Sequence, residues 1–144
     1  MIKFYFFLFI GMFYVQGSAF GQNCSGAHSA SMIPITTQNN VEFAYRINHC
    51  STGDEVLLQI NNTSNNNVTI TFTPKIFSAN QGWEPANAVS ITLNAQSSLN
   101  ATPCSTNNSN TSFVGKEIFP NEYFPAQNSL PQILSLELLN INVN

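Results

Sequence analysis

Apolar and polar residues alternate with a period of two through most of the chain after residue 40. Val41, Phe43, Tyr45 and Ile47 alternate with polar or small residues. This pattern places one row of side chains on a buried face and the other in solvent, as in a β-strand with one solvated face. A second apolar row, 56–60, follows the turn-forming residues 51–54. The two rows therefore predict a β-hairpin.

Further segments repeat this alternation. Residues 68–73 alternate apolar side chains with threonine, a β-branched series that suits a pleated surface and disfavours a helix. Residues 89–93 show the same pattern, 113–119 are a less regular candidate, and 32–36 are a further short one. Together these segments predict six to seven strands.

The last segment is the most apolar part of the chain after the N-terminal region. Leu134, Leu136 and Leu138 occupy one parity, whereas the apolar residues from Leu139 to Val143 occupy the other. The change of phase predicts a β-bulge, or a strand that leaves one sheet and finishes facing the other. The alternative is a short amphipathic helix over 131–139, with Pro131 in its first turn.

Loops rich in Asn, Ser and Pro separate the predicted strands. This spacing is typical of an all-β fold, an antiparallel β-sandwich, with a small barrel as the alternative. The two longest loops, 61–67 and 96–112, have the composition of solvated connectors. Residues 81–85, Gln-Gly-Trp-Glu-Pro, also read as a loop.

The N-terminus has the three regions of an export signal. Lys3 supplies a positive charge, residues 4–15 are apolar, and small residues follow up to Gly21. The apolar run is shorter than the roughly 20 residues of a membrane-spanning helix. We expect a signal peptide over 1–21, cleaved after Ala19 or, preferably, after Gly21. A single domain would then occupy 22–144, with 22–31 as a loose N-terminal segment, in a secreted, surface or periplasmic protein without a membrane span.

Charge excludes several classes of partner. Charged residues make up 8% of the chain and the formal net charge is −3. After the signal only three basic residues remain, Arg46, Lys75 and Lys116. They form no patch for nucleic-acid phosphates or anionic lipid, so the expected partner is a protein or a polysaccharide.

A family resemblance rests on three segments. Ala19-Phe20-Gly21-Gln22 ends the signal, residues 41–47 read Val-Glu-Phe-Ala-Tyr-Arg-Ile, and residues 53–58 read Gly-Asp-Glu-Val-Leu-Leu. In these features the chain resembles small secreted bacterial proteins with an immunoglobulin-like β-sandwich and no assigned activity. The resemblance implies an immunoglobulin-like arrangement of six to seven strands. It brings no catalytic or binding residue, and Trp83 does not match the core tryptophan of antibody domains because its segment reads as a loop.

The chain after the signal holds three cysteines, which would meet an oxidising environment on export. Cys50 ends a predicted strand and Cys104 lies in a long loop, so we expect a Cys50–Cys104 disulfide. The alternative is Cys24–Cys50.

Candidate chemistry is sparse. The histidines, His28 and His49, stand next to no nucleophile motif, and no metal-ligand spacing occurs. We therefore predict no catalytic residue, no metal and no cofactor. Trp83 is the candidate ligand contact, and Tyr123 a second exposed aromatic residue.

These observations leave three hypotheses for function. The first is a non-catalytic, exported surface, matrix or protein-interaction module. The second is a small carbohydrate-binding module that uses Trp83. The third is a secreted hydrolase that uses a pair of glutamates.

Overall fold

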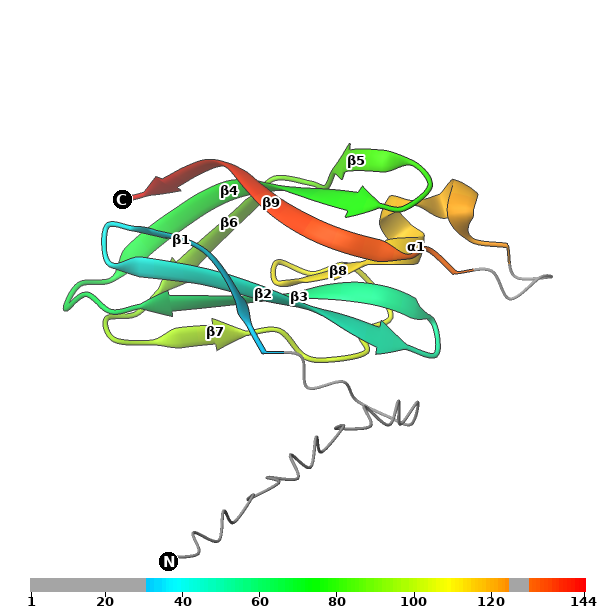
Figure 1. The fold of residues 1–144 in the computed structure, drawn as a ribbon. Helices are drawn as coiled ribbons and strands as arrows, with labels where there is room; N and C mark the ends of the chain where they lie inside the picture. Colours follow the sequence, from blue (N-terminus) through cyan, green and yellow to red (C-terminus); the bar gives the residue numbers. More distant parts are fainter. Residues whose placement is uncertain (1–30, 125–129) are drawn as a thin grey trace, which may run out of the picture.

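Two antiparallel β-sheets pack face to face in the computed structural model, which describes residues 31–124 and 130–144 (Figure 1). The predicted all-β sandwich is confirmed. The expected signal peptide, the loose segment up to residue 30 and Cys24 lie outside the described residues. No helix in the described ranges is long and apolar enough to cross a membrane.

Sheet A is built on a three-stranded meander. β1 (Ile33–Gln38), β2 (Val41–Cys50) and β3 (Gly53–Asn62) follow one another in the sheet. Two short strands, β7 (Ser98–Asn100) and β8 (Ser112–Val114), pair with opposite ends of β3. The hairpin of β2 and β3 runs in unbroken register from Val41 opposite Asn62 to Cys50 opposite Gly53, as the alternation predicts.

Sheet B is built around β4 (Val68–Ser78). β9 (Ile133–Val143) pairs along nearly the whole of β4. On the opposite side of β4 lie β5 (Gly82–Pro85) and β6 (Val89–Leu93). A helical turn, α1 (Gly115–Ile118), and a 3-10 turn, η1 (Pro120–Glu122), connect the last strand of sheet A to the segment before β9.

The core consists of the inward-facing apolar residues of both sheets. Phe43 of β2 and Phe72 of β4 meet edge to face, with ring centroids 6.2 Å apart and planes at 77°. Each large side chain removed from water contributes about 1.5–3 kcal/mol to folding. The core side chains with 0 or 1% exposure are Val41, Phe43, Val56, Leu58, Ile60, Ile70, Ile76 and Phe119.

The predicted bulge in the last strand is confirmed. Thr71 pairs with Asn142 but Thr73 pairs with Leu139, so β9 carries one extra residue there. Asn140 takes up the irregularity with a φ of 54°, a conformation that asparagine tolerates better than most residues. The alternative helix over 131–139 does not form, because residues 133–139 lie in β9 and pair with β4 instead.

Several strand boundaries differ from the sequence prediction. Gly82–Pro85 is strand β5, not a loop, since it pairs with Lys75–Ser78. Residues 113–119 divide into β8 and α1, and the loop 96–112 contains β7. The structure therefore has nine strands in its described ranges, where the sequence predicts six or seven. The additional strands are short ones that depend on pairing with β3 or β4 rather than on their own composition.

Candidate functional site

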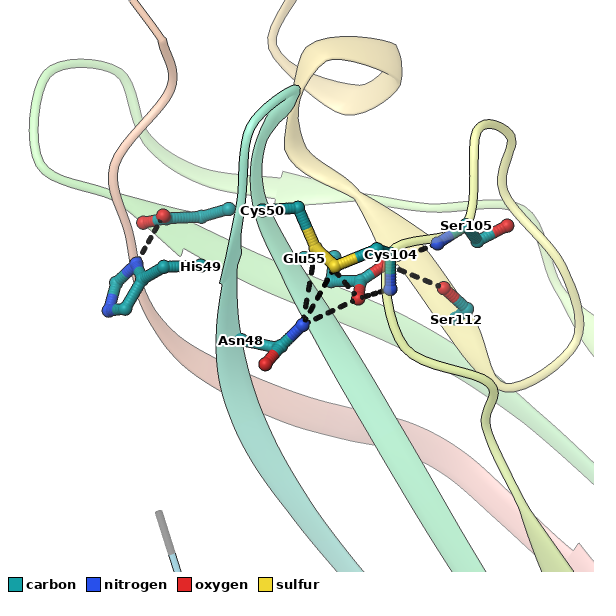
Figure 2. Close-up of a disulfide and its surroundings, with 8 residues drawn as sticks. Asn48, His49, Cys50, Glu55, Cys104, Ser105 and Ser112 are labelled. Atoms are coloured by element: carbon teal, nitrogen blue, oxygen red, sulfur yellow. Dashed lines mark hydrogen bonds and ion pairs between the residues drawn. A yellow bond between two sulfur atoms is a disulfide. The ribbon is translucent and has the colours of Figure 1, made fainter. Parts of the chain in front are cut away.

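A disulfide joins Cys50 to Cys104, as expected (Figure 2). The Cα atoms are 5.5 Å apart and the residues are separated by 54 positions. Since a cysteine forms a single disulfide, this pairing excludes the alternative Cys24–Cys50. The bridge ties the end of β2 to the connection between β7 and β8, all within sheet A. It therefore does not link the two sheets as the antibody disulfide does.

Beside the disulfide lies a buried carboxylate, that of Glu55, which is 1% exposed. Its Oε1 atom accepts the Nδ2–H of Asn48 at 3.0 Å and the backbone N–H of Cys104. Its Oε2 atom accepts the backbone N–H of Ser105 at 3.1 Å and the hydroxyl of Ser112 at 3.4 Å. Figure 2 shows these donors converging on the carboxylate from β2, from β8 and from the segment between β7 and β8 that contains Cys104, which we call the disulfide loop. The Glu55 side chain thus holds that loop against sheet A.

Cys50, Glu55 and Cys104 also form a group of residue types that can ligate metals. The ligand atoms of Cys50, Glu55 and Cys104 lie within 4.8 Å of one another. In the disulfide, however, the two sulfur atoms are bonded to each other. Both oxygens of Glu55 accept hydrogen bonds from the protein. The arrangement is that of a structural anchor.

Asp54, next to Glu55, points to the other face of β3 and also accepts hydrogen bonds. Its Oδ1 atom lies 2.5 Å from Nδ1 of His49, directly opposite in the β2–β3 hairpin. Its Oδ2 atom accepts the backbone N–H of Ile133 at 3.0 Å. The His49 side chain is 58% exposed and that of Asp54 12%. This carboxylate connects sheet A to the first residue of β9.

Trp83 lies on the outer face of sheet B, on β5. It is paired with Phe77 of β4, and their ring centroids are 5.3 Å apart. The Nζ atom of Lys75 lies 5.4 Å from the centre of the Trp83 ring, a cation–π geometry. All three side chains are half-buried. We call Lys75, Phe77 and Trp83 the outer aromatic cluster.

The outer aromatic cluster faces solvent because of the register of β4. Even-numbered residues from Val68 to Ser78 are buried, whereas the odd-numbered ones alternate with them on the opposite face. Gly82, with a φ of 81°, closes the turn that returns the chain into β5 and brings Trp83 beside Phe77. On the other side of β4, Glu137 of β9 is opposite Lys75 and is exposed.

Tyr123, the second predicted contact residue, follows η1 and is half-buried. The residue before it, Glu122, is buried and accepts a hydrogen bond from the Ser78 hydroxyl at the end of β4. This bond places η1 beside the β4–β5 turn, because the Ser78 Oγ also accepts the N–H of Gln81 at 3.0 Å. A ligand contact at Tyr123 stays a prediction.

Sequence reasoning missed the role of Glu55 and the partners of Trp83. A signal for Glu55 exists: Val56, Leu57 and Leu58 form a continuous apolar run, which indicates a strand buried on both faces. Glu55 shares its face with Leu57 and is buried with it. The signal for Phe77 is the alternation of residues 68–73, which continues to residue 78 and places Phe77 on the outer face of the strand.

Comparison with known proteins found no match among protein-family models, curated proteins or solved structures.

Proposed function

We propose that the protein is an exported, non-catalytic β-sandwich that acts as a surface, matrix or protein-interaction module. The observation that carries the proposal is the outer aromatic cluster. Aromatic residues are enriched at the centres of protein interfaces, because they bury a large area and lose little side-chain entropy. Here two aromatic rings and a cation share the solvent-facing side of a rigid sheet.

The proposal of export is supported by two features. The N-terminal 21 residues have the order of regions of a signal peptide. The Cys50–Cys104 disulfide is a kind of bond that persists in oxidising compartments. The resemblance to small secreted immunoglobulin-like proteins is part of the same proposal, and the two packed antiparallel sheets are compatible with it.

The proposal of a non-catalytic role rests on how the carboxylates are used. A glycoside hydrolase of the usual kind would need two carboxyl groups facing a common substrate. Both oxygens of Glu55 accept hydrogen bonds inside the protein, and the two of Asp54 contact His49 and Ile133. These groups serve to hold strands and a loop in position.

A second candidate function is carbohydrate binding, and the geometry of Trp83 favours it. A flat indole ring on an exposed sheet can stack on a sugar ring. The ammonium group of Lys75 lies beside the indole and can donate hydrogen bonds to hydroxyl or carboxylate groups of a sugar. Under this hypothesis the ligand would be a polysaccharide that contacts β4 and β5.

The test is a binding comparison between the protein and its Trp83→Ala variant on immobilised extracellular proteins and polysaccharides. The matched control is Arg46→Ala, which changes a half-buried residue on sheet A. Binding to a polypeptide that is lost in Trp83→Ala and kept in Arg46→Ala supports the interaction module. The same result with a polysaccharide supports the second candidate. Binding that is equal in all three proteins, or hydrolysis of any substrate, contradicts the proposal.

Trp83 also provides a direct signal, because it is the only tryptophan of the chain. Titration with soluble polysaccharides should shift its emission in a saturable way if a sugar stacks on it. The Trp83→Phe variant should keep the fold. Because it has no tryptophan emission, its expected loss of binding is measured by isothermal titration calorimetry. Emission that is unchanged over the whole panel would contradict carbohydrate binding at this site.

A further inference from the structure

β9 is an edge strand whose free edge is closed at both ends and open in the middle. At its start the N–H of Ile133 donates to Asp54 Oδ2 at 3.0 Å. Near its end the carbonyl of Ile141 accepts Gln38 Nε2 at 3.4 Å, and the carbonyl of Val143 accepts Asn39 Nδ2 at 3.1 Å. Side chains of sheet A thus occupy backbone groups that would otherwise be available to another strand.

The register shows which backbone groups remain available between these ends. Pro74 has no N–H, and its carbonyl accepts the N–H of Ala86 on the side of β4 away from β9. Its opposite residue, Leu138, is therefore in a non-hydrogen-bonded pair, and the N–H and C=O of Leu138 point away from β4. By alternation Leu136 has the same orientation. In the described ranges no other segment supplies a partner to either residue.

The two sheets are unequal in width at this side of the sandwich. Sheet A has β1 as a further strand beyond β2, whereas in the part of the chain that the structure describes no strand of sheet B follows β9 on this side. Ile33 of β1 is paired with the core residue Tyr45 and so lies on the inward side, yet it is 47% exposed. The hydrogen bonds of Gln38 and Asn39 to β9 place β1 and β9 on the same side of the molecule (Figure 1). Among the described residues, sheet A therefore extends one strand further than sheet B on this side of the molecule.

Side-chain chemistry indicates which kind of strand fits. Leu134 and Leu139 at the borders of the open stretch are 49% and 39% exposed. Glu137 lies between them, exposed, and its cross-strand neighbour Lys75 extends toward Trp83 on the opposite side of β4. An incoming strand with apolar residues and one cation opposite Glu137 would complement this edge.

A second copy of the chain fits less well. In an antiparallel pairing that uses the free backbone groups of both Leu136 and Leu138, Leu136 of one copy lies opposite Leu138 of the other. That register places Glu137 opposite the same glutamate of the second copy, and like charges directly opposite each other destabilise a strand pair.

We propose that the stretch Leu134–Leu139 of β9 binds an extended peptide segment of another protein, which adds a strand to sheet B and carries a basic residue opposite Glu137. Main-chain hydrogen bonds to Leu136 and Leu138 supply the affinity, and the charge supplies selectivity. This inference rests on the proposed role as an interaction module and names the kind of partner.

The test uses a short synthetic peptide that alternates valine with threonine and has one lysine at a threonine position. Amide hydrogen exchange is followed by NMR in the free and the peptide-saturated protein. We expect the N–H groups of Leu136 and Leu138 to exchange fast in the free protein and slowly in the complex. Those of Ser135 and Glu137, already bonded to β4, should change little. A peptide of the same sequence with alternate amides N-methylated should not bind.

A charge exchange tests the selectivity. In the Glu137→Lys variant the lysine peptide should bind about five- to tenfold more weakly, and its glutamate analogue more tightly by a similar factor. Equal affinity of both peptides for both proteins, or binding of the N-methylated peptide, would overturn the proposal. Protection of Leu136 and Leu138 that increases with protein concentration alone would identify a second copy as the occupant and overturn it as well. Partner binding that depends on Trp83 without peptide protection of β9 would overturn this inference and leave the proposed function intact.

Discussion

Asp54 and Ile133 connect the two sheets by a hydrogen bond, in which the carboxylate on β3 accepts the backbone N–H at the first residue of β9. The residues are 79 positions apart in the chain, and the bond is buried. It belongs to neither strand ladder. The Asp54 carboxylate therefore specifies where β9 begins relative to sheet A.

Replacing Asp54 by alanine should leave the Ile133 N–H buried and unpaired. We expect the free energy of unfolding in urea to fall by about 1–3 kcal/mol. His49→Ala is the matched control, because it removes the other side chain at Asp54 from a mainly exposed position. The control should cost about 1 kcal/mol or less. An equal loss in both variants would show that Ile133 does not depend on Asp54.

Glu55→Gln tests the anchor of the disulfide loop. The amide keeps the shape of the side chain but turns one acceptor oxygen into a donor, which then faces the donors of the Cys104–Ser105 loop. We expect a loss of about 2–4 kcal/mol in unfolding free energy and faster amide exchange at Ser105. Glu84→Gln, at an exposed position, should leave both quantities unchanged. Unchanged exchange at Ser105 in Glu55→Gln would contradict the anchoring role.

Removing the disulfide should destabilise the protein, because the unfolded chain without the bridge gains conformational entropy. For a loop of 54 residues the chain-entropy relation gives about 4 kcal/mol for Cys50→Ala combined with Cys104→Ala, measured by urea unfolding. Cys24→Ala is the control and should retain the bridge, as shown by the mass increase on reduction and alkylation. Loss of the bridge in Cys24→Ala would contradict the assigned pairing.

Glu55 and the disulfide hold the same loop, so their contributions should not add. In the variant that combines Cys50→Ala with Cys104→Ala, Glu55→Gln should lower the free energy of unfolding by less than it does in the native protein. We expect the difference to be about 0.5–3 kcal/mol. A double-mutant cycle of urea unfolding measures this coupling. Additive losses would mean that the loop is held by two independent attachments.

Gly115 lies at the start of α1, where the chain passes close to β3. A Cβ atom there would be 2.9 Å from the backbone oxygen of Asp54 and 3.2 Å from Ile133 Cδ1. Gly115→Ala therefore requires a shift of the backbone, and we expect a loss of about 1–3 kcal/mol in thermal or urea unfolding. A variant as stable as the native protein would show that α1 moves away from β3 at little cost.

Much of the fold is predictable from the sequence because its longest strands carry their own pattern. The alternation at 41–47 and 68–73 reflects one face packed on the opposite sheet, a relation that is local in the chain. The change of phase after Leu138 likewise predicts the bulge at Asn140. Strand β5 has a glycine and a proline in four residues, so its existence depends on the partner β4.

The functional features depend on contacts that are distant in the chain. The donors that explain the burial of Glu55 come 49 and 50 positions later, on a loop of low complexity. The pairing of Trp83 with Phe77 needs a turn that the composition alone does not distinguish from a longer loop. The free edge of β9 becomes visible only when the orientation of each carbonyl is known.

The disulfide also sets how the molecule would respond to a pulling force. Residues 50 and 104 enclose the hairpin strand β3, the whole of β4 and the short strands up to β7 in one covalent ring. A force applied at the two ends of the chain passes across the bridge and bypasses that ring. At about 3.3–3.6 Å per residue, roughly 180–190 Å of extended length would stay locked after the sheets have separated. A protein attached at one end to a surface and at the other to a partner would therefore extend less when it unfolds, because the residues between the two cysteines stay enclosed by the bridge.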